Sequence, residues 1–249
     1  MLIDTHCHVH EPLELELPDV LKNAQDADVG SMICVGTSEE SSRQAIAFSE
    51  QHSQAFAAIG VHPHDTKDGY GAIASLAGSS DRIVAVGEIG LDYFYGHSPK
   101  EVQVVALKAQ IEVALAHDLP IIFHVRDAFD DFWPIFDSYT GIRGVLHSFT
   151  DSQINMEEAI KRGLYIGLNG ISTFTKDEAQ KATFDAIPAD RILFETDAPF
   201  LTPAPYRGKI NQPAYVRLVA EYHAGRRGIS FEEIADVSTK NARTLFALS

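Results

Sequence analysis

The amino-acid sequence predicts an α/β protein of the (β/α)8 or TIM-barrel class, because short apolar segments alternate with helical segments along the chain. Eight segments have the length and the continuous apolar character of strands buried in a parallel sheet. The segments between them carry apolar residues at helical spacing, as in VQVVALKAQIEVALAHD. No G-x-G-x-x-G motif follows the first strand, which favours closure into a barrel over an open, doubly wound sheet.

The predicted strands are taken in order from the N-terminus. They are LIDTHCHV (2–9), SMICVGT (31–37), FAAIGVH (56–62), IVAVGEIG (83–90), PIIFHVR (120–126), RGVLHSF (143–149), LYIGLNG (164–170) and ILFETDA (192–198). The crossovers between them are long enough to carry helices. After the last strand, TPAPYRGKINQP predicts a long functional loop, followed by terminal helices.

The length and composition predict one domain over residues 1–249, since α/β barrels of about 200–250 residues commonly form one domain. The chain has no apolar run of membrane-spanning length and no signal-peptide pattern at its start, so we expect a cytoplasmic protein without a membrane partner. Cys7 and Cys34 have no C-x-x-C spacing, which predicts packed thiols and not a disulfide framework or a thiolate zinc site.

The formal net charge of −15 excludes a protein that coats duplex nucleic acid, because such binding depends on an excess of Lys and Arg. A polyanionic substrate must therefore be attracted locally, and a metal cluster is one way to do so.

Polar residues gather at the carboxyl ends of the predicted strands, the end at which barrel enzymes carry their active sites. In an extended strand the side chains of His6 and His8 share one face, which is a geometry suited to metal ligands. A lone histidine in a strand is more often a hydrogen-bonded core residue. Here, however, so many predicted strands end in a histidine or an acid that chance is a weak explanation. The residues at these ends are His6, His8, His62, Glu88, His124, His147 and Asp197.

The donor set indicates the kind of metal. Counted without His62, the set has four imidazoles and two carboxylates and no thiolate, which suits Zn²⁺, Mn²⁺ or Mg²⁺ and leaves positions open for water. Six ligands are too many for one catalytic zinc, so we expect two divalent ions bridged by a carboxylate, and Glu88 is the natural bridge from its place in the strand order.

Several motifs together resemble the TatD family of metal-dependent hydrolases. They cover essentially the whole chain and are DTHCH, GVHPH, GEIGLDY, PIIFHVRDA, HSFTD, ETDAPFL, RGKINQP and NARTLF. The resemblance implies a TIM barrel of the amidohydrolase superfamily with a divalent metal centre and a phosphodiesterase activity described as DNase, often exonucleolytic.

Carried over residue by residue, the resemblance implies two ions that share Glu88. The first is held by His6, His8, Glu88 and Asp197, and the second by Glu88, His124 and His147. The chain departs from the family at His10, where Asp is common, and at Asp151, where Gly is common. We expect His10 on the surface or at the rim, and Asp151 as an added acid near the rim.

Asp197 and Glu88 are the predicted catalytic residues. Asp197 is a metal ligand that can also act as general base, and the sequence leaves the two roles open. Arg126 is predicted to point inward and hold a phosphate oxygen, or else to pair with a carboxylate. His62, more than His64, is predicted to contact substrate or support a metal ligand, and Arg207, with Lys209, is either a phosphate contact or a strut of its loop.

Three functions stay open at this point. The first is a phosphodiesterase acting on DNA ends or single strands, for which DNA or another phosphodiester is the partner and no obligate protein partner is indicated. The second is an amide or lactone hydrolase on the same barrel, which is disfavoured because no lysine accompanies Glu88 as a potential carbamylated bridge. The third, a noncatalytic metal-binding protein, is disfavoured by a ligand set with open coordination.

Overall fold

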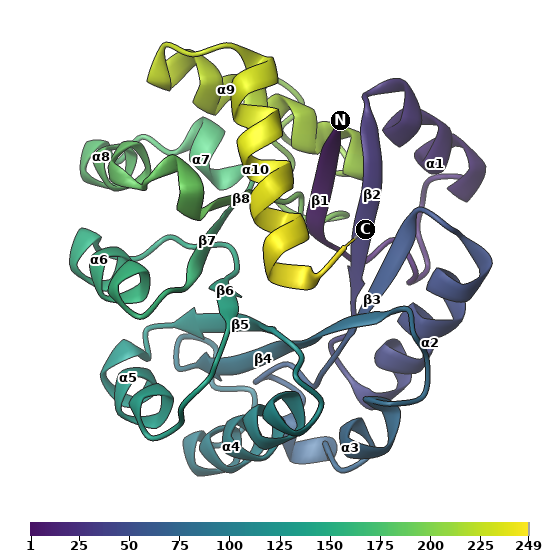
Figure 1. Ribbon diagram of the computed structural model, residues 1–249, viewed down its shortest axis with the longest axis vertical. Coiled ribbons are helices and arrows are strands. Elements are labelled where there is room, and N and C mark those ends of the chain that lie inside the picture. The colour runs from purple at the N-terminus through teal and green to yellow at the C-terminus, as the bar shows by residue number, and fades with distance from the viewer. Residues whose placement is uncertain (249) are drawn as a thin grey trace. The chain divides into compact units, whose positions relative to one another are not determined.

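The computed structural model describes residues 1–248 and contains eight strands that follow one another in a single sheet in the order of the sequence (Figure 1). Alternation with helices and sequential strand order are the features of the predicted (β/α)8 class. The strands are β1 (Leu2–Cys7), β2 (Val29–Val35), β3 (Ala55–Ile59), β4 (Ile83–Asp92), β5 (Ile121–Arg126), β6 (Gly144–Leu146), β7 (Tyr165–Leu168) and β8 (Ile192–Phe194).

Helices fill the segments between and after the strands. They are α1 (Leu17–Asp26), α2 (Glu39–Gln51), α3 (Ile73–Leu76), α4 (Lys100–Ala116), α5 (Phe129–Asp137), α6 (Gln153–Lys161), α7 (Ile171–Phe174), α8 (Glu178–Ala186), α9 (Val216–Arg227) and α10 (Phe231–Phe246), with short 3-10 helices η1 (Thr66–Asp68), η2 (Ala189–Arg191) and η3 (Pro213–Tyr215). Across residues 1–248, none of these helices combines the length and the apolar character required to cross a membrane.

Local sequence explains where several helices begin and end. The side chains of Ser38, Ser152 and Asp177 accept a backbone N–H in the first turns of α2, α6 and α8. At the start of α10, Ser230 and Glu233 form a reciprocal capping box. Polar residues just before the apolar helical pattern therefore set these boundaries.

The described residues cluster into two compact units, which are treated separately below. The central unit is Cys34–His147, and the terminal unit combines Met1–Ile33 with the residues from Ser148 onward. The prediction of a single domain over 1–249 stays a prediction.

In the central unit, β4 pairs in parallel with β3 on one side and with β5 on the other. Helix α2 packs against β3, and α4 packs against β4 (Figure 1). The side chains of Ile59, Ile89, Leu107 and Phe123 are fully buried, so the apolar strand segments form the core as their composition predicts.

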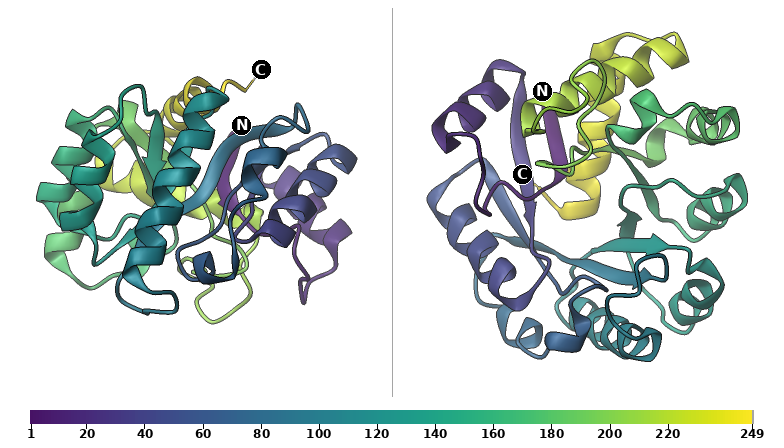
Figure 2. Two further views of the ribbon diagram at one scale, coloured as in Figure 1. Left: turned by 90° about the horizontal axis from the view of Figure 1, so that it is seen from below. Right: turned by 180° about the vertical axis from the view of Figure 1, so that it is seen from behind.

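In the terminal unit, β7 pairs in parallel with β8, and Cys7 forms an isolated parallel bridge with Ala198. Helix α10 packs against β1 and β8 and contacts α9, as Figure 2 shows. The first strand and the last helices of the chain therefore belong to one unit.

All eight predicted strands are present, but most of them end earlier than predicted. His8, His62, His147 and Asp197 lie one to three residues beyond their strands. Asp197, three residues beyond β8, has a φ of +58°, which is outside the extended conformation. The candidate site residues at these positions therefore lie on the first residues of loops.

Gly90 illustrates how closely β4 and β5 approach. A Cβ at Gly90 would lie 1.7 Å from the carbonyl oxygen of His124, which is its partner across the strand pair. The absence of a side chain at Gly90 is therefore required for the pairing that positions His124.

We expect Gly90→Ala to lower the free energy of unfolding by about 2–3 kcal/mol, because one of the two strands must move to admit the methyl group. Urea denaturation followed by circular dichroism measures the change. Gly71→Ala is the matched control, since a Cβ there meets nothing within 4 Å. Equal stability of the two variants would contradict the close approach.

Candidate metal centre

The terminal unit brings together His6, His8 and Asp197, called here the terminal group. Backbone hydrogen bonds align the two segments, since Asp197 N–H donates to His6 O (2.8 Å) and His8 N–H donates to Ala198 O (2.7 Å). The Nε2 atoms of His6 and His8 lie 3.2 Å apart, on the common face that strand alternation predicts. Asp197 Oδ1 lies 3.6 Å from His6 Nε2 and 3.3 Å from His8 Nε2.

These separations fit one metal ion. Two ligands bound tetrahedrally at ~2.1 Å from zinc are ~3.4 Å apart, and octahedral neighbours are ~3.0 Å apart. The three separations in the terminal group, 3.2, 3.3 and 3.6 Å, fall around these values. The imidazoles are buried, whereas the side chain of Asp197 is 15% exposed, so the group is accessible from the Asp197 side.

A buried carboxyl supports the terminal group without belonging to it. Thr196 donates its N–H to Asp4 Oδ1 (2.9 Å) and its hydroxyl to Asp4 Oδ2 (2.6 Å). Burial raises the pKa of Asp4 to about 8, although the hydrogen bonds from Thr196 favour the charged form. Because Asp4 is two residues before His6 and Thr196 is next to Asp197, this contact fixes the register of the two ligand-bearing segments.

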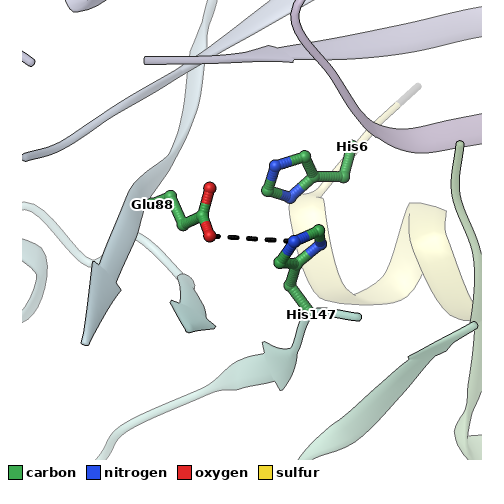
Figure 3. A group of neighbouring side chains, drawn as sticks. All are labelled: His6, Glu88 and His147. Atoms are coloured by element: carbon green, nitrogen blue, oxygen red, sulfur yellow. Dashed lines mark ion pairs between the residues drawn. The ribbon is translucent and has the colours of Figure 1, made fainter. Parts of the chain in front are cut away.

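The central unit brings together His62, Glu88, His124 and His147, called here the central group. Glu88 is buried on β4, and its Oε1 lies 2.9 Å from His124 Nδ1, 3.5 Å from His62 Nε2 and 3.7 Å from His147 Nε2. Figure 3 shows the carboxylate of Glu88 directed at the ring of His147. One carboxylate oxygen therefore has three imidazole nitrogens at the separations expected between ligands of a common ion.

The protonation states suit a cation. Burial lowers the pKa of His62 to about 3 despite the nearby Glu88, so at neutral pH the ring is neutral, the form that binds metals. Burial also disfavours the charged form of His124, but hydrogen bonds to Asp92 and Glu88 outweigh it and raise the pKa of His124. Asp92 and Glu88 thus favour a positive charge at His124, and a bound divalent ion would supply such a charge.

Asp92 is a candidate supporting residue that the sequence analysis missed. Its Oδ2 lies 3.0 Å from His124 Nε2 and 3.0 Å from His64 Nε2, while its side chain is fully buried. Burial alone would raise the pKa of Asp92, but hydrogen bonds from His124 and the N–H of Tyr95 lower it below its ordinary value. An Nε2–H donated to Asp92 leaves Nδ1 of His124 as the atom that faces Glu88, which is the usual way a carboxylate orients a metal-binding histidine.

A signal for Asp92 was present in the sequence. It stands four residues after Glu88 in the same strand, so alternation places both carboxylates on one face. The sequence analysis used GEIGLDY as a motif but gave its aspartate no role.

The predicted substrate residues of the central unit lie beside the central group. His62 Nδ1 accepts the N–H of His64 (3.2 Å), and its Nε2 faces Glu88, which places His62 where it supports that carboxylate. Arg126 is exposed and holds its guanidinium 4.0 Å from the ring centroid of Phe94. Its guanidinium also lies 4.9 Å from the ring centroid of Tyr95, and both predicted roles of Arg126, a phosphate contact or a carboxylate partner, stay predictions.

Arg207 stabilises the loop after β8. It donates to the carbonyl of Thr202 (3.2 Å), and its guanidinium lies 3.6 Å from the ring centroid of Phe174. Asn211, in the same RGKINQP stretch, donates to the carbonyls of Thr196 (2.8 Å) and Phe200 (2.6 Å), on both sides of Asp197. The stretch thus braces the terminal group, and a phosphate contact by Arg207 stays a prediction.

The two departures from the family pattern have structural explanations. Of the two expected places for His10, the surface is wrong, because its side chain is 0% exposed and burial lowers its pKa to about 3, while a place at the rim stays a prediction. The chain turns after Val9 and brings the His10 ring to 6.2 Å from that of His8. Asp151 accepts hydrogen bonds from Ser152 N–H and the Asn155 side chain, both at 2.6 Å, at the start of α6.

Comparison with known proteins places this geometry in context. The model of the TatD related DNase family matches residues 3–247. The chain is 38% identical to the uncharacterized metal-dependent hydrolase YabD of Bacillus subtilis, over 100% of both chains. It is 36% identical to the 3′-5′ ssDNA/RNA exonuclease TatD of Salmonella typhimurium, over 92% of each chain. The crystal structure of YJJV, a TatD homologue from Escherichia coli, superposes with a TM-score of 0.92 at 28% identity and covers 100% of this chain and 98% of that one.

We expect Asp92→Asn to weaken metal binding by the central group about 10- to 100-fold, because the amide cannot provide the charge that orients His124. Zn²⁺ or Mn²⁺ titration against a competing chelator measures the affinity, with Asp197→Ala as the background so that the terminal group does not mask the change. Asp81→Asn, at an exposed position before β4, is the matched control. An unchanged affinity in Asp92→Asn would show that His124 does not depend on this contact.

Proposed function

Because the chain belongs to the TatD related DNase family, whose members are metal-dependent hydrolases, we propose that it removes nucleotides from the ends of single-stranded DNA or RNA. The Salmonella relative is named for this activity, and we propose the same 3′-to-5′ direction here. The observation that carries the proposal is the pair of buried donor groups, each of which combines imidazole nitrogens with a carboxylate at metal-ligand separations.

We propose two divalent ions per chain. His6, His8 and Asp197 hold one, while His124 and His147 hold the other, with Glu88 as the ligand common to both. Nitrogen and oxygen donors without a thiolate accept Zn²⁺, Mn²⁺ or Mg²⁺. His62, at 3.5 Å from Glu88, supports the carboxylate in this arrangement.

The ions, when bound, neutralise charge on the phosphodiester and acidify a water molecule. The side chains of the chain then have separate tasks. Asp197 has the partly exposed carboxylate of the terminal group, and it is the one that accepts a proton from the attacking water. His6 and His8 are held in place by buried backbone contacts, so they orient Asp197 and exclude water from its inner side.

Charge selects the substrate. The chain carries a formal −15, which repels long duplex nucleic acid, whereas the donor groups loaded with cations are locally positive. We therefore propose that short or single-stranded ends are processed faster than blunt duplex.

Replacing Glu88 tests the catalytic assignment. We expect Glu88→Ala to reduce nucleotide release by about 100- to 1,000-fold or more without unfolding the chain, because a central carboxylate of the site is lost. The measurement is release of nucleotides from a 3′-labelled single strand with added Mg²⁺, Mn²⁺ or Zn²⁺. Glu50→Ala, at an exposed position of α2, is the matched control.

Two outcomes of this assay contradict the proposal. Full turnover by folded Glu88→Ala rules out its role as a ligand. The second outcome is that the wild-type chain releases no nucleotides with any of these metals and instead hydrolyses amides or lactones. That result would favour an amide or lactone hydrolase.

Elemental analysis tests the number of ions. We expect about two divalent ions per chain after metal loading and gel filtration, and fewer than two in Asp197→Ala, because the first ion then loses its unshared carboxylate and keeps only His6, His8 and the shared Glu88. A stoichiometry of one in the wild type would contradict the shared role of Glu88.

A further inference from the structure

Two neighbouring aromatic side chains of the central unit are strongly exposed. Phe94 is 56% exposed and Tyr95 is 52% exposed, in the segment between β4 and α4 (Figure 1). Their rings meet edge to face, with centroids 4.8 Å apart and planes at 85°. Exposed apolar rings in adjacent positions mark a surface that binds something else more often than scattered single residues do.

The backbone of this segment is fixed. The N–H groups of Phe94 and Tyr95 both donate to Asp92 Oδ1 at 3.0 Å. Further along, the hydroxyl of Ser98 donates to the carbonyl of His64 (2.6 Å). The two rings are therefore exposed on a preorganised segment, which reduces the entropy lost when a ligand binds.

A cation accompanies the rings. The guanidinium of Arg126 lies 4.0 Å from the ring centroid of Phe94 and 4.9 Å from that of Tyr95. Because a planar guanidinium both stacks and binds phosphate, Arg126 supplies charge complementary to a phosphodiester in a chain of formal charge −15.

The rings are connected to the central group through one residue. Asp92 binds their backbone through Oδ1 and faces His124 through Oδ2. The ring of His64, which also contacts Asp92, lies 5.3 Å from that of Tyr95. The segment that carries the rings and the candidate ligand His124 are thus held by the same carboxylate.

We propose that Phe94 and Tyr95 form a stacking surface for a nucleobase of a single-stranded substrate, with Arg126 contacting an adjacent phosphate. The proposal rests on the nucleolytic function proposed above and adds the residues that hold the base. Aromatic rings with an arginine are the usual means of binding single strands without sequence preference, and stacking requires an unpaired base. This surface therefore selects frayed or single-stranded ends over blunt duplex.

A cycle of enzyme and substrate variants tests the stacking. We expect the double variant Phe94→Ala, Tyr95→Ala to raise KM for a single strand about tenfold while kcat changes little. On an oligonucleotide with abasic residues at its 3′ end, wild type and double variant should have equal KM values. Phe94→Trp should keep the wild-type KM, and Tyr139→Ala, which removes an aromatic ring at the far end of α5 that contacts Glu112, is the matched control.

A binding measurement without turnover separates this proposal from the one above. Fluorescence anisotropy of a labelled oligothymidylate with chelator-treated protein should show affinity lowered about tenfold in the double variant. If the wild type hydrolyses no oligonucleotide, the nucleolytic function fails, while this binding result still decides the stacking surface.

Two results would overturn the stacking surface. One is equal affinity and equal KM in wild type and double variant. The other is a wild-type dimer in sedimentation that the double variant lacks, with oligonucleotide affinity unchanged, because the rings would then bind a second copy of the chain.

Discussion

The candidate site of the central unit depends on the hydrogen bonds made by one buried carboxylate, that of Asp92. A charge removed from water is costly unless hydrogen bonds compensate for it, and Asp92 has four such contacts. Two come from the rings of His64 and His124, and two come from the backbone N–H groups of Phe94 and Tyr95. The same charge thus orients a candidate metal ligand and fixes the exposed aromatic segment, so that the position of the rings and that of the ligand are coupled.

In the terminal unit, different contacts hold the candidate ligands in place. Its ligands are aligned by backbone hydrogen bonds between His6, His8 and the segment around Asp197, and by the buried contact between Asp4 and Thr196. Asp197 has a positive φ that costs a non-glycine residue about 1 kcal/mol or more, and Asn211 braces the carbonyls on either side of it. Strain at a candidate ligand is thus compensated by contacts from later residues of the same loop, the one that follows β8.

Sequence reasoning found the eight strands because buried parallel strands read as continuous apolar runs. It extended several of them too far, since His62 follows an apolar residue directly and only the backbone conformation shows that the pairing has ended. It named by strand end the residues that form the two candidate donor groups, but it missed Asp92 and misjudged the burial of His10. The error at His10 concerns burial, which depends on how the segment after β1 folds back, whereas Asp92 lies on β4 and was overlooked although alternation places it on the face of Glu88.

The two donor groups differ in how much of the chain they need. The central group takes all its residues from positions 62–147, whereas the terminal group joins positions 6 and 8 to position 197. During synthesis on the ribosome, the central donors are therefore all translated while Asp197 is still missing. The candidate donor set that is first complete in a nascent chain is therefore the central group, and the terminal group is complete only after the last strand has been made.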